Sequence, residues 1–386
     1  VNNYIAYNLT GTPMDMMLMG TAYQDKYRNL DAYSKKTMMA KLFWDITDNQ
    51  ELRLGYTANR SDDVLYPSTP MDALYDDSDI FNVEYIAKDL GTYSKELNIQ
   101  FYQSEVDHPM SNLYRKSATV IANEKTHALT SKMQGAKLTN SFDVDNHMIT
   151  TGLDYSKRNW DGRFILNGNP ALWKSIADVD TKNVALFIKD KITMDKFVLD
   201  LGLRYDDTEI TSKNTMQSNN DYNELNGYIL GTYNANETTK YFAGFGKSSR
   251  VPDARELYLR MPTMTGIIEV GNPNLDNTVN YEFDIGAEKK YENATIKAKA
   301  FYSMLDDFIA YNSTGTIDGY NLENVDATIY GFELSGTYVA TESLYFDYGM
   351  SYQRGKKDNE LEGQEGLGKD MPEIPPFKFN GAVNYD

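Results

Sequence analysis

The sequence predicts an all-β protein, a transmembrane antiparallel up-and-down β-barrel. Two observations predict it: apolar and polar residues alternate along many short segments, and the connections between those segments are alternately tight and long. In one segment, Leu199, Leu201 and Leu203 fall on one face of a strand, and Asp200 and Arg204 fall on the other. Such a strand suits a barrel whose outside meets lipid and whose lumen meets water.

The alternation recurs along most of the chain. It predicts that Phe346, Tyr348 and Met350 face outward, as the three leucines do. Outside the connections, no window of ten or more residues has a convincing helical spacing of apolar positions. About seventeen segments have the length needed to cross a bilayer at a tilt. They cover residues 3–10, 14–24, 32–46, 51–61, 80–89, 94–106, 126–143, 147–159, 181–194, 197–208, 222–235, 240–248, 279–290, 293–305, 324–340, 344–354 and 376–386.

The connections follow a strict order. Tight turns are expected near residues 47–50, 89–93, 145–146, 195–196, 236–239, 292–293 and 341–343. Long polar excursions are expected at about 60–80, 107–125, 160–180, 249–278 and 355–375, with two shorter ones between them. Because neighbouring antiparallel strands reverse direction, all tight turns should lie at one end of the barrel and all long connections at the other.

Composition excludes several other classes of protein. The chain has 386 residues, 41% of them hydrophobic, which excludes disorder; it has no Cys, which excludes disulfide scaffolds, zinc ribbons, iron–sulfur clusters and thiol catalysis. A net charge of −18 argues against nucleic acid as a partner. The three His residues form no catalytic arrangement with Ser and an acid that the sequence can place together, so we predict no enzyme.

A soluble β-solenoid, propeller or sandwich is the competing architecture. Soluble blades would show a four-strand repeat with similar loops, and the sequence has no internal repeat. The number of predicted strands is odd, and the chain starts and stops within alternating segments. We therefore expect residues 1–386 to be a single incomplete transmembrane β-barrel domain, with an N-terminal plug and the first and last strands missing.

Four ordered motifs carry a family resemblance. They are FAGFGKSSRVPDARELY at 242–258, GNPNL at 271–275 followed by Tyr281-Glu282, ENVDATIYGFELS at 323–335, and PEIPP at 372–376. Together they resemble the barrel signature of TonB-dependent outer-membrane receptors. That resemblance implies a barrel of about 22 strands around a plug domain, in the bacterial outer membrane, with outer-membrane lipid and, through the plug, the TonB complex as partners. The motif residues themselves are expected to shape the backbone and to touch no cargo.

Methionine is the residue that bears on cargo. The chain has 17 Met and 3 His, and Met71 lies in one long excursion while His108-Pro109-Met110 opens the next. Thioether and imidazole groups together favour copper, above all Cu(I), over the hard cations that carboxylates bind. The tight turn near Gly91 should return the chain to the same end of the barrel, so the two excursions should begin as neighbours. The alternative is a structural role, in which these Met residues pack one loop against another and bind no metal.

The segments PMDALYDDS at 70–78 and VDHPMSN at 106–112 resemble the copper receptor subfamily of TonB-dependent receptors. In that subfamily a His-x-Met pair and an upstream loop Met bind copper together with a Cys-x-x-x-Met pair of the plug. The resemblance implies that Met71, His108 and Met110 are copper ligands, converging on the lumen side of the outer loops, with copper as the transported ion. The plug's ligands lie outside this chain, so at most half of such a site is visible.

Other His and Met residues have structural interpretations. His127 begins a strand, and His147 follows a tight turn, which puts it at the periplasmic end. The cluster of Met14, Met16, Met17 and Met19 reads as packing toward the membrane. Met261 and Met264 flank Pro262 in a long outer connection and could pass copper inward.

Several functions remain open on the sequence alone. The leading one is active copper import by a plugged, TonB-dependent receptor. A receptor for a ferric siderophore, haem or another metal chelate would use the same scaffold, although siderophore loops are usually richer in aromatic and basic residues and haem loops in His. A passive porin is disfavoured, because a barrel of this width without its plug would be an unregulated hole.

Overall fold

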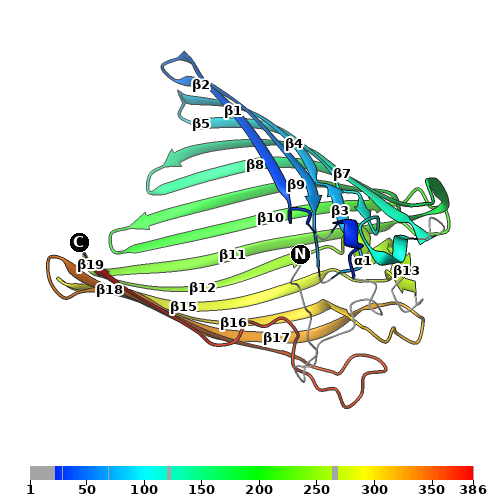
Figure 1. Cartoon of the computed structure of the whole chain (residues 1–386). Helices are drawn as coiled ribbons and strands as arrows, with labels where there is room; N and C mark the ends of the chain where they lie inside the picture. The colour runs from blue at the N-terminus through cyan, green and yellow to red at the C-terminus, as the bar shows by residue number, and fades with distance from the viewer. Residues whose placement is uncertain (1–21, 28, 68, 120–122, 263–267, 386) are drawn as a thin grey trace.

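A computed structural model describes residues 22–27, 29–67, 69–119, 123–262 and 268–385. One strongly curved antiparallel sheet of seventeen strands dominates it, and Figure 1 shows the sheet wrapping around a central space. No helix among the described residues is long and apolar enough to cross a membrane.

The sheet contains fifteen long strands that pair in sequence order and two short ones, β3 and β6, at its outer end. The long strands are β1 (Ser34–Thr47), β2 (Gln50–Val64), β4 (Asp77–Gly91), β5 (Ser94–Asp107), β7 (Lys125–Val144), β8 (His147–Leu166), β9 (Asn169–Met194), β10 (Phe197–Thr211), β11 (Asn220–Asn236), β12 (Thr239–Arg250), β15 (Thr278–Lys290), β16 (Ala294–Tyr311), β17 (Leu322–Val339), β18 (Leu344–Lys357) and β19 (Lys378–Tyr385). Each matches one predicted strand from residue 32 onward. The predicted strand at 3–10 and most of the one at 14–24 lie outside the described residues.

The two ends of the sheet differ as predicted. Tight turns join β1 to β2, β4 to β5, β7 to β8, β9 to β10, β11 to β12, β15 to β16 and β17 to β18, on the left in Figure 1. The outer end carries the longer connections and the small elements. These are η1 (Asp25–Tyr27), β3 (Asp72–Tyr75), β6 (Met110–Ser111), η2 (Lys116–Ala118), α1 (Ala254–Tyr258), β13 (Arg260–Pro262) and β14 (Ile268–Val270).

One predicted excursion is wrong. Residues 160–180 form no polar loop, because β8 and β9 continue as a tall hairpin up to Leu166 and Asn169. Asn167 and Gly168 make the turn with φ values of 52° and 77°. Two consecutive left-handed residues form the turn that matches strand twist, and Asn-Gly is its preferred sequence. This turn signal outweighed the polar composition of the segment.

The two faces of the sheet carry different side chains. Leu203 is 55% exposed, and its cross-strand partners on β9 and β11 are Ile188 and Gly227. On the opposite face, Arg204 forms ion pairs with Asp154 and Asp206. An apolar outer face is required because lipid cannot solvate charge. The outward direction predicted for Leu203 agrees with this arrangement.

Near the C-terminal end the predicted outward residues lie on a shared aromatic face. Phe346 stacks on the exposed ring of Tyr338, with ring centroids 6.4 Å apart, and Met350 lies opposite Leu334. Asp347 lies on the opposite face of β18, where it accepts a hydrogen bond from Thr337.

Aromatic rings lie over glycines of the neighbouring strand at several points of the sheet. A Cβ atom added to the glycine would lie 2.2–2.4 Å from a ring atom in each case, closer than real Cβ atoms approach. Each pair is directly opposite in register, so the ring fills the space that the glycine leaves. The pairs are Tyr102 with Gly135, Phe187 with Gly152, Tyr228 with Gly202, and Phe242 with Gly286.

A dry core lies at the outer end, where α1 packs against β9. Leu257, Tyr258 and Leu275 are buried there with Ile176 and Ile210. Asp253 caps α1 in a capping box with Glu256. A Cβ on Gly271 would lie 2.8 Å from backbone atoms of α1, so only glycine permits this approach. Residues 253–271 of the motif therefore shape the backbone at the outer end, whereas residues 244–248 line the cavity described below.

Candidate metal site and lumen wall

The β2–β4 and β5–β7 connections are joined to each other above the sheet. In β3, Ala73 pairs with Met110 of β6, and Met110 in turn pairs with His127 of β7. The backbone N–H of Leu74 donates to the carbonyl of Pro109 at 2.9 Å, and that of His108 donates to Leu129 at 2.9 Å. The two connections that hold the predicted ligands are thus paired with each other at the outer end of the large sheet.

Met71 and Met110 occupy diagonal positions where β3 pairs with β6. Met71 directly precedes β3 and is two residues from Ala73, the cross-strand partner of Met110. Diagonal neighbours of this kind are about 7–8 Å apart between backbone positions, within reach of two flexible side chains. Both Met residues are half-buried.

His108 is oriented by a carboxylate. Its Nδ1 lies 3.3 Å from Oδ1 of Asp76, and about a quarter of the side chain is exposed. A His that donates from one ring nitrogen to a carboxylate presents the lone pair of the other nitrogen, and metal-binding His residues are usually held in this way. With Nδ1 facing Asp76, Nε2 is the nitrogen that would bind a metal.

His127 is the residue that sequence reasoning placed apart from the site. It lies directly opposite Met110, is buried, and stacks on Phe164 with ring centroids 4.3 Å apart. Its Nε2 hydrogen-bonds to the hydroxyl of Ser175. These contacts fit the structural role predicted for it, but its position opposite Met110 follows from β6–β7 register, which periodicity alone does not give.

The other His and Met residues discussed in the sequence analysis lie elsewhere in the structure or outside its described residues. His147 begins β8 at the tight-turn end, where its Nδ1 lies 2.7 Å from Asp190. Met261 packs against the dry core beside α1. Met264 and the cluster of Met14, Met16, Met17 and Met19 lie outside the described residues. Among the described residues, no group of three or more His, Cys, Asp or Glu could hold a metal ion. The candidate metal site therefore stays the one that the sequence predicts, Met71, His108 and Met110.

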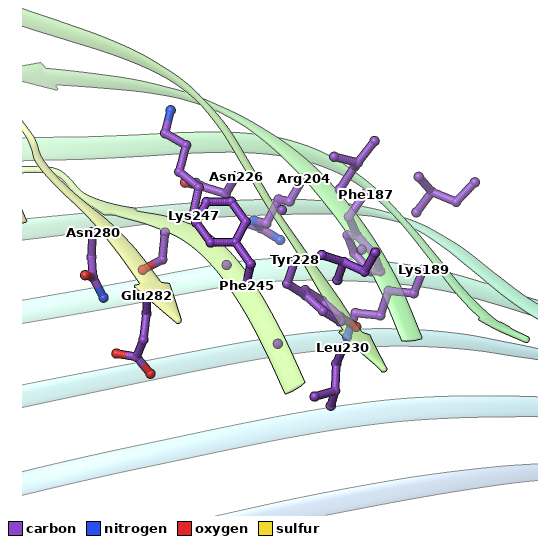
Figure 2. A pocket seen from close by; sticks show the side chains of 18 of the residues that line it. Phe187, Lys189, Arg204, Asn226, Tyr228, Leu230, Phe245, Lys247, Asn280 and Glu282 are labelled. Atoms are coloured by element: carbon purple, nitrogen blue, oxygen red, sulfur yellow. The ribbon is translucent and has the colours of Figure 1, made fainter. Parts of the chain in front are cut away.

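A second candidate site is a cavity on the lumen face of the sheet. A cavity of about 610 Å³ is lined by residues of β7, β9, β10, β11, β12 and β15. Figure 2 shows Phe187, Lys189 and Arg204 close together there, beside Tyr228. The charged groups of Lys137, Lys189 and Arg204 lie 5.4–5.9 Å from the ring centre of Phe187. The lining also includes the carboxylates of Glu282 and Asp284, and Arg204 is paired with Asp154 and Asp206. Lys137 and Lys189 beside Phe187 are therefore the groups of this wall best suited to an anionic, aromatic ligand.

Comparisons with solved structures identify the fold. The chain is similar to the copper transporter OprC, with 18% identity, a TM-score of 0.78, and coverage of 94% of this chain and 58% of that one. It is also similar to the apoprotein of the FrpB iron transporter from Neisseria meningitidis (F5-1 variant), with 15% identity, a TM-score of 0.70, and coverage of 98% and 59%. The ferric-catecholate import receptor Fiu from E. coli K12 shows 14% identity, a TM-score of 0.64, and coverage of 92% and 62%.

The chain therefore spans about three fifths of the length of these receptors. No functionally curated protein matches it by sequence. The family model for the β-barrel of TonB-dependent receptor-like proteins matches residues 2–386. The chain belongs to this family of TonB-dependent receptor β-barrels of the bacterial outer membrane.

Proposed function

We propose that this chain is the larger part of the barrel of a receptor that imports a metal ion or metal chelate across the outer membrane. In this proposal the complete barrel has about 22 strands and encloses a plug, which lies outside this chain and couples to the TonB complex. Support comes from the family of the barrel and from the metal cargoes named for the solved receptors that it resembles. The cargo is bound at the outer mouth before it enters the lumen.

We further propose that the cargo is copper. The observation that supports this proposal is the pairing of β3 with β6, in which Ala73 lies opposite Met110 and Met71 is two residues from Ala73. Two thioethers and an imidazole make a soft donor set, which favours copper over iron or calcium. Because the copper ion is transported rather than kept, these three ligands need to bind it only with moderate affinity. They also leave a coordination position open for a further ligand.

Each residue has a defined part in the proposed site. Met71 and Met110 supply sulfur ligands from adjacent strands, and His108 supplies Nε2, oriented by Asp76 through Nδ1. The remaining ligands would come from the plug, as the resemblance to the copper subfamily implies. Copper then leaves the outer connections when the plug moves.

A metal chelate is the second candidate cargo. The observation that favours it is the lumen wall around Phe187, where Lys137, Lys189 and Arg204 face a cavity large enough for an organic anion. Ferric siderophores commonly combine aromatic and anionic groups, which this wall would bind. Passive diffusion, as in a porin, would need neither this wall nor the soft donors.

The test is copper binding by the full-length receptor. We expect the changes Met71→Leu, Met110→Leu and His108→Asn each to weaken Cu(I) binding by about tenfold or more, since each removes a ligand while keeping side-chain volume similar. Met216→Leu is the matched control, because Met216 is a highly exposed methionine of the β10–β11 connection. Isothermal titration with competing chelators measures the affinity. Unchanged affinity in all three variants excludes the copper site, and uptake of a ferric chelate by the same variants then tests the second candidate.

A further inference from the structure

The segment Ala22–Tyr27, which precedes β1, lies against the β5–β7 connection. The backbone N–H of Lys116 donates to the carbonyl of Ala22 at 2.8 Å, and that of Gln24 donates to Tyr114 at 2.9 Å. The side-chain amide of Gln24 adds bonds to the carbonyls of Leu113 and Arg115. Residues 22–24 thus lie antiparallel to residues 114–116, with an isolated β-bridge between Tyr23 and Arg115, and η1 follows.

The same segment also reaches the aromatic part of this connection. The ring of Tyr27 meets that of Tyr114 edge-on, with centroids 5.0 Å apart, and the Tyr114 hydroxyl donates to Asp63. Burial raises the pKa of Tyr114, and the bond to Asp63 raises it further, so the phenol stays a neutral donor at physiological pH. Tyr27 thus packs on a tyrosine of the β5–β7 connection that is itself bonded to β2.

Tyr23 is at the centre of this contact. Its ring lies 3.8 Å from the guanidinium carbon of Arg115, and its hydroxyl donates to Oδ1 of Asp72 at 2.8 Å. Arg115 and Asp72 form an ion pair, and both side chains are fully buried. Arg115 also donates to the carbonyl of Tyr66 at 2.9 Å. A buried ion pair depends on every donor that compensates it, so Tyr23 is part of what keeps the pair formed.

This buried pair is joined directly to the candidate metal site. Asp72 follows Met71 in the chain and pairs in register with Ser111, the residue after Met110. Oδ1 of Asp72 also accepts the backbone N–H of Tyr66 at 2.8 Å, which closes the turn that leads to Met71. A shift of Asp72 must therefore move Met71 relative to Met110.

We propose that Tyr23 is a positioning residue for metal binding, and that Ala22–Tyr27 is a latch. With the latch docked, Tyr23 fixes Arg115 and Asp72, and these fix the spacing of Met71 and Met110. With the latch released, β3 and β6 separate and the site loosens. The chain before β1 is thereby coupled to the outer mouth through one aromatic side chain. The inference rests on the proposed copper function for its ligand, but the docked latch itself does not depend on the cargo.

The experiment compares Tyr23→Ala and Tyr23→Phe in the full-length receptor, with Tyr33→Ala as the control. Tyr33 is an exposed tyrosine close to the latch in sequence. We expect Tyr23→Ala to weaken Cu(I) binding about tenfold, as removal of a residue that supports metal ligands does. Tyr23→Phe keeps the stacking on Arg115 but removes a donor to a buried carboxylate, so its loss of affinity should lie between those of wild type and Tyr23→Ala. Tyr33→Ala should bind as wild type does.

A second measurement, made without metal, is amide hydrogen exchange. Tyr23→Ala should accelerate exchange in residues 66–77 and 107–116 and leave β15 and β16 unchanged, with the same global unfolding midpoint. Unchanged exchange in the first two segments overturns the latch whatever the cargo is. If the three ligand variants weaken copper binding and Tyr23→Ala does not, the positioning role is overturned while the copper site stands. If the ligand variants have no effect, it is the copper proposal that fails.

Discussion

The membrane-crossing part of the sheet and its outer connections are stabilised in different ways. In the first, each strand bonds only to its neighbours, with an apolar outer face and a lumen face of ion pairs and rings over glycines. In the second, side chains bond to distant backbone and to each other, as Arg115 does with Asp72 and Tyr66. The first is repetitive and tolerates local change. The second depends on single buried contacts, and the candidate metal site lies there.

The largest expected effect tests the outer region. Arg115→Met leaves the carboxylate of Asp72 buried without its cation, and breaking a buried pair in this way costs about 3–5 kcal/mol. We expect the cost to appear as local opening, measured as proteolytic cleavage within residues 64–77 and 107–125 of an otherwise intact barrel. The double change Arg115→Met with Asp72→Leu should recover part of the resistance, since no buried charge remains. Loss of the whole barrel in the single variant would show that the two regions are not separable.

The next effect tests the outer face of the sheet. Leu203→Arg puts a charge toward lipid and should lower the free energy of unfolding by about 2–4 kcal/mol, measured by reversible denaturation in lipid vesicles. Asn226→Arg is the control, because Asn226 lies opposite Arg204 on the lumen face and should change stability by less than about 1 kcal/mol. Equal losses would contradict the assignment of the two faces.

A smaller effect concerns the rings that lie over glycines. Gly286→Ala places a Cβ against the ring of Phe242 and should destabilise by about 1–3 kcal/mol, as overpacking does. Gly349→Ala is the matched control, since among the described residues no atom lies within 4 Å of the added Cβ. Adding Phe242→Leu should relieve only the part of the cost that comes from the ring, because the added Cβ would also lie 2.6 Å from the carbonyl oxygen of Ala298. A double-mutant cycle without coupling would argue against the contact.

The smallest effect is at the tip of the β8–β9 hairpin. Gly168 has a φ of 77°, so Gly168→Ala should cost about 1 kcal/mol of local stability from the left-handed backbone. Amide exchange at Leu166 and Asn169 should rise, with no change in the global unfolding midpoint, because the tip lies beyond the membrane-crossing part. A lowered midpoint would show that the hairpin extension supports the barrel.

The sequence by itself determined the fold class, the order of the strands and the sorting of the connections to two ends. These follow from local rules: a period of two along each strand, turn residues between strands, and reversal of direction at each turn. Those rules failed at 160–180, where polar composition indicated a loop and the Asn-Gly turn continued the hairpin. Residue chemistry and a family resemblance, rather than these rules, identified Met71, His108 and Met110 as candidates.

Only the tertiary structure decided how these candidates lie. The pairing of Ala73 with Met110 and of Met110 with His127 depends on register between strands far apart in sequence, and a shift of one residue would turn a side chain to the other face. The contact of His108 with Asp76, and the packing of Tyr23 against the ion pair of Arg115 and Asp72, depend on side-chain contacts that no periodicity encodes. Local pattern fixes the faces of strands, whereas long-range contacts bring single residues of separate connections together, and a site built from such connections is decided by the fold as a whole.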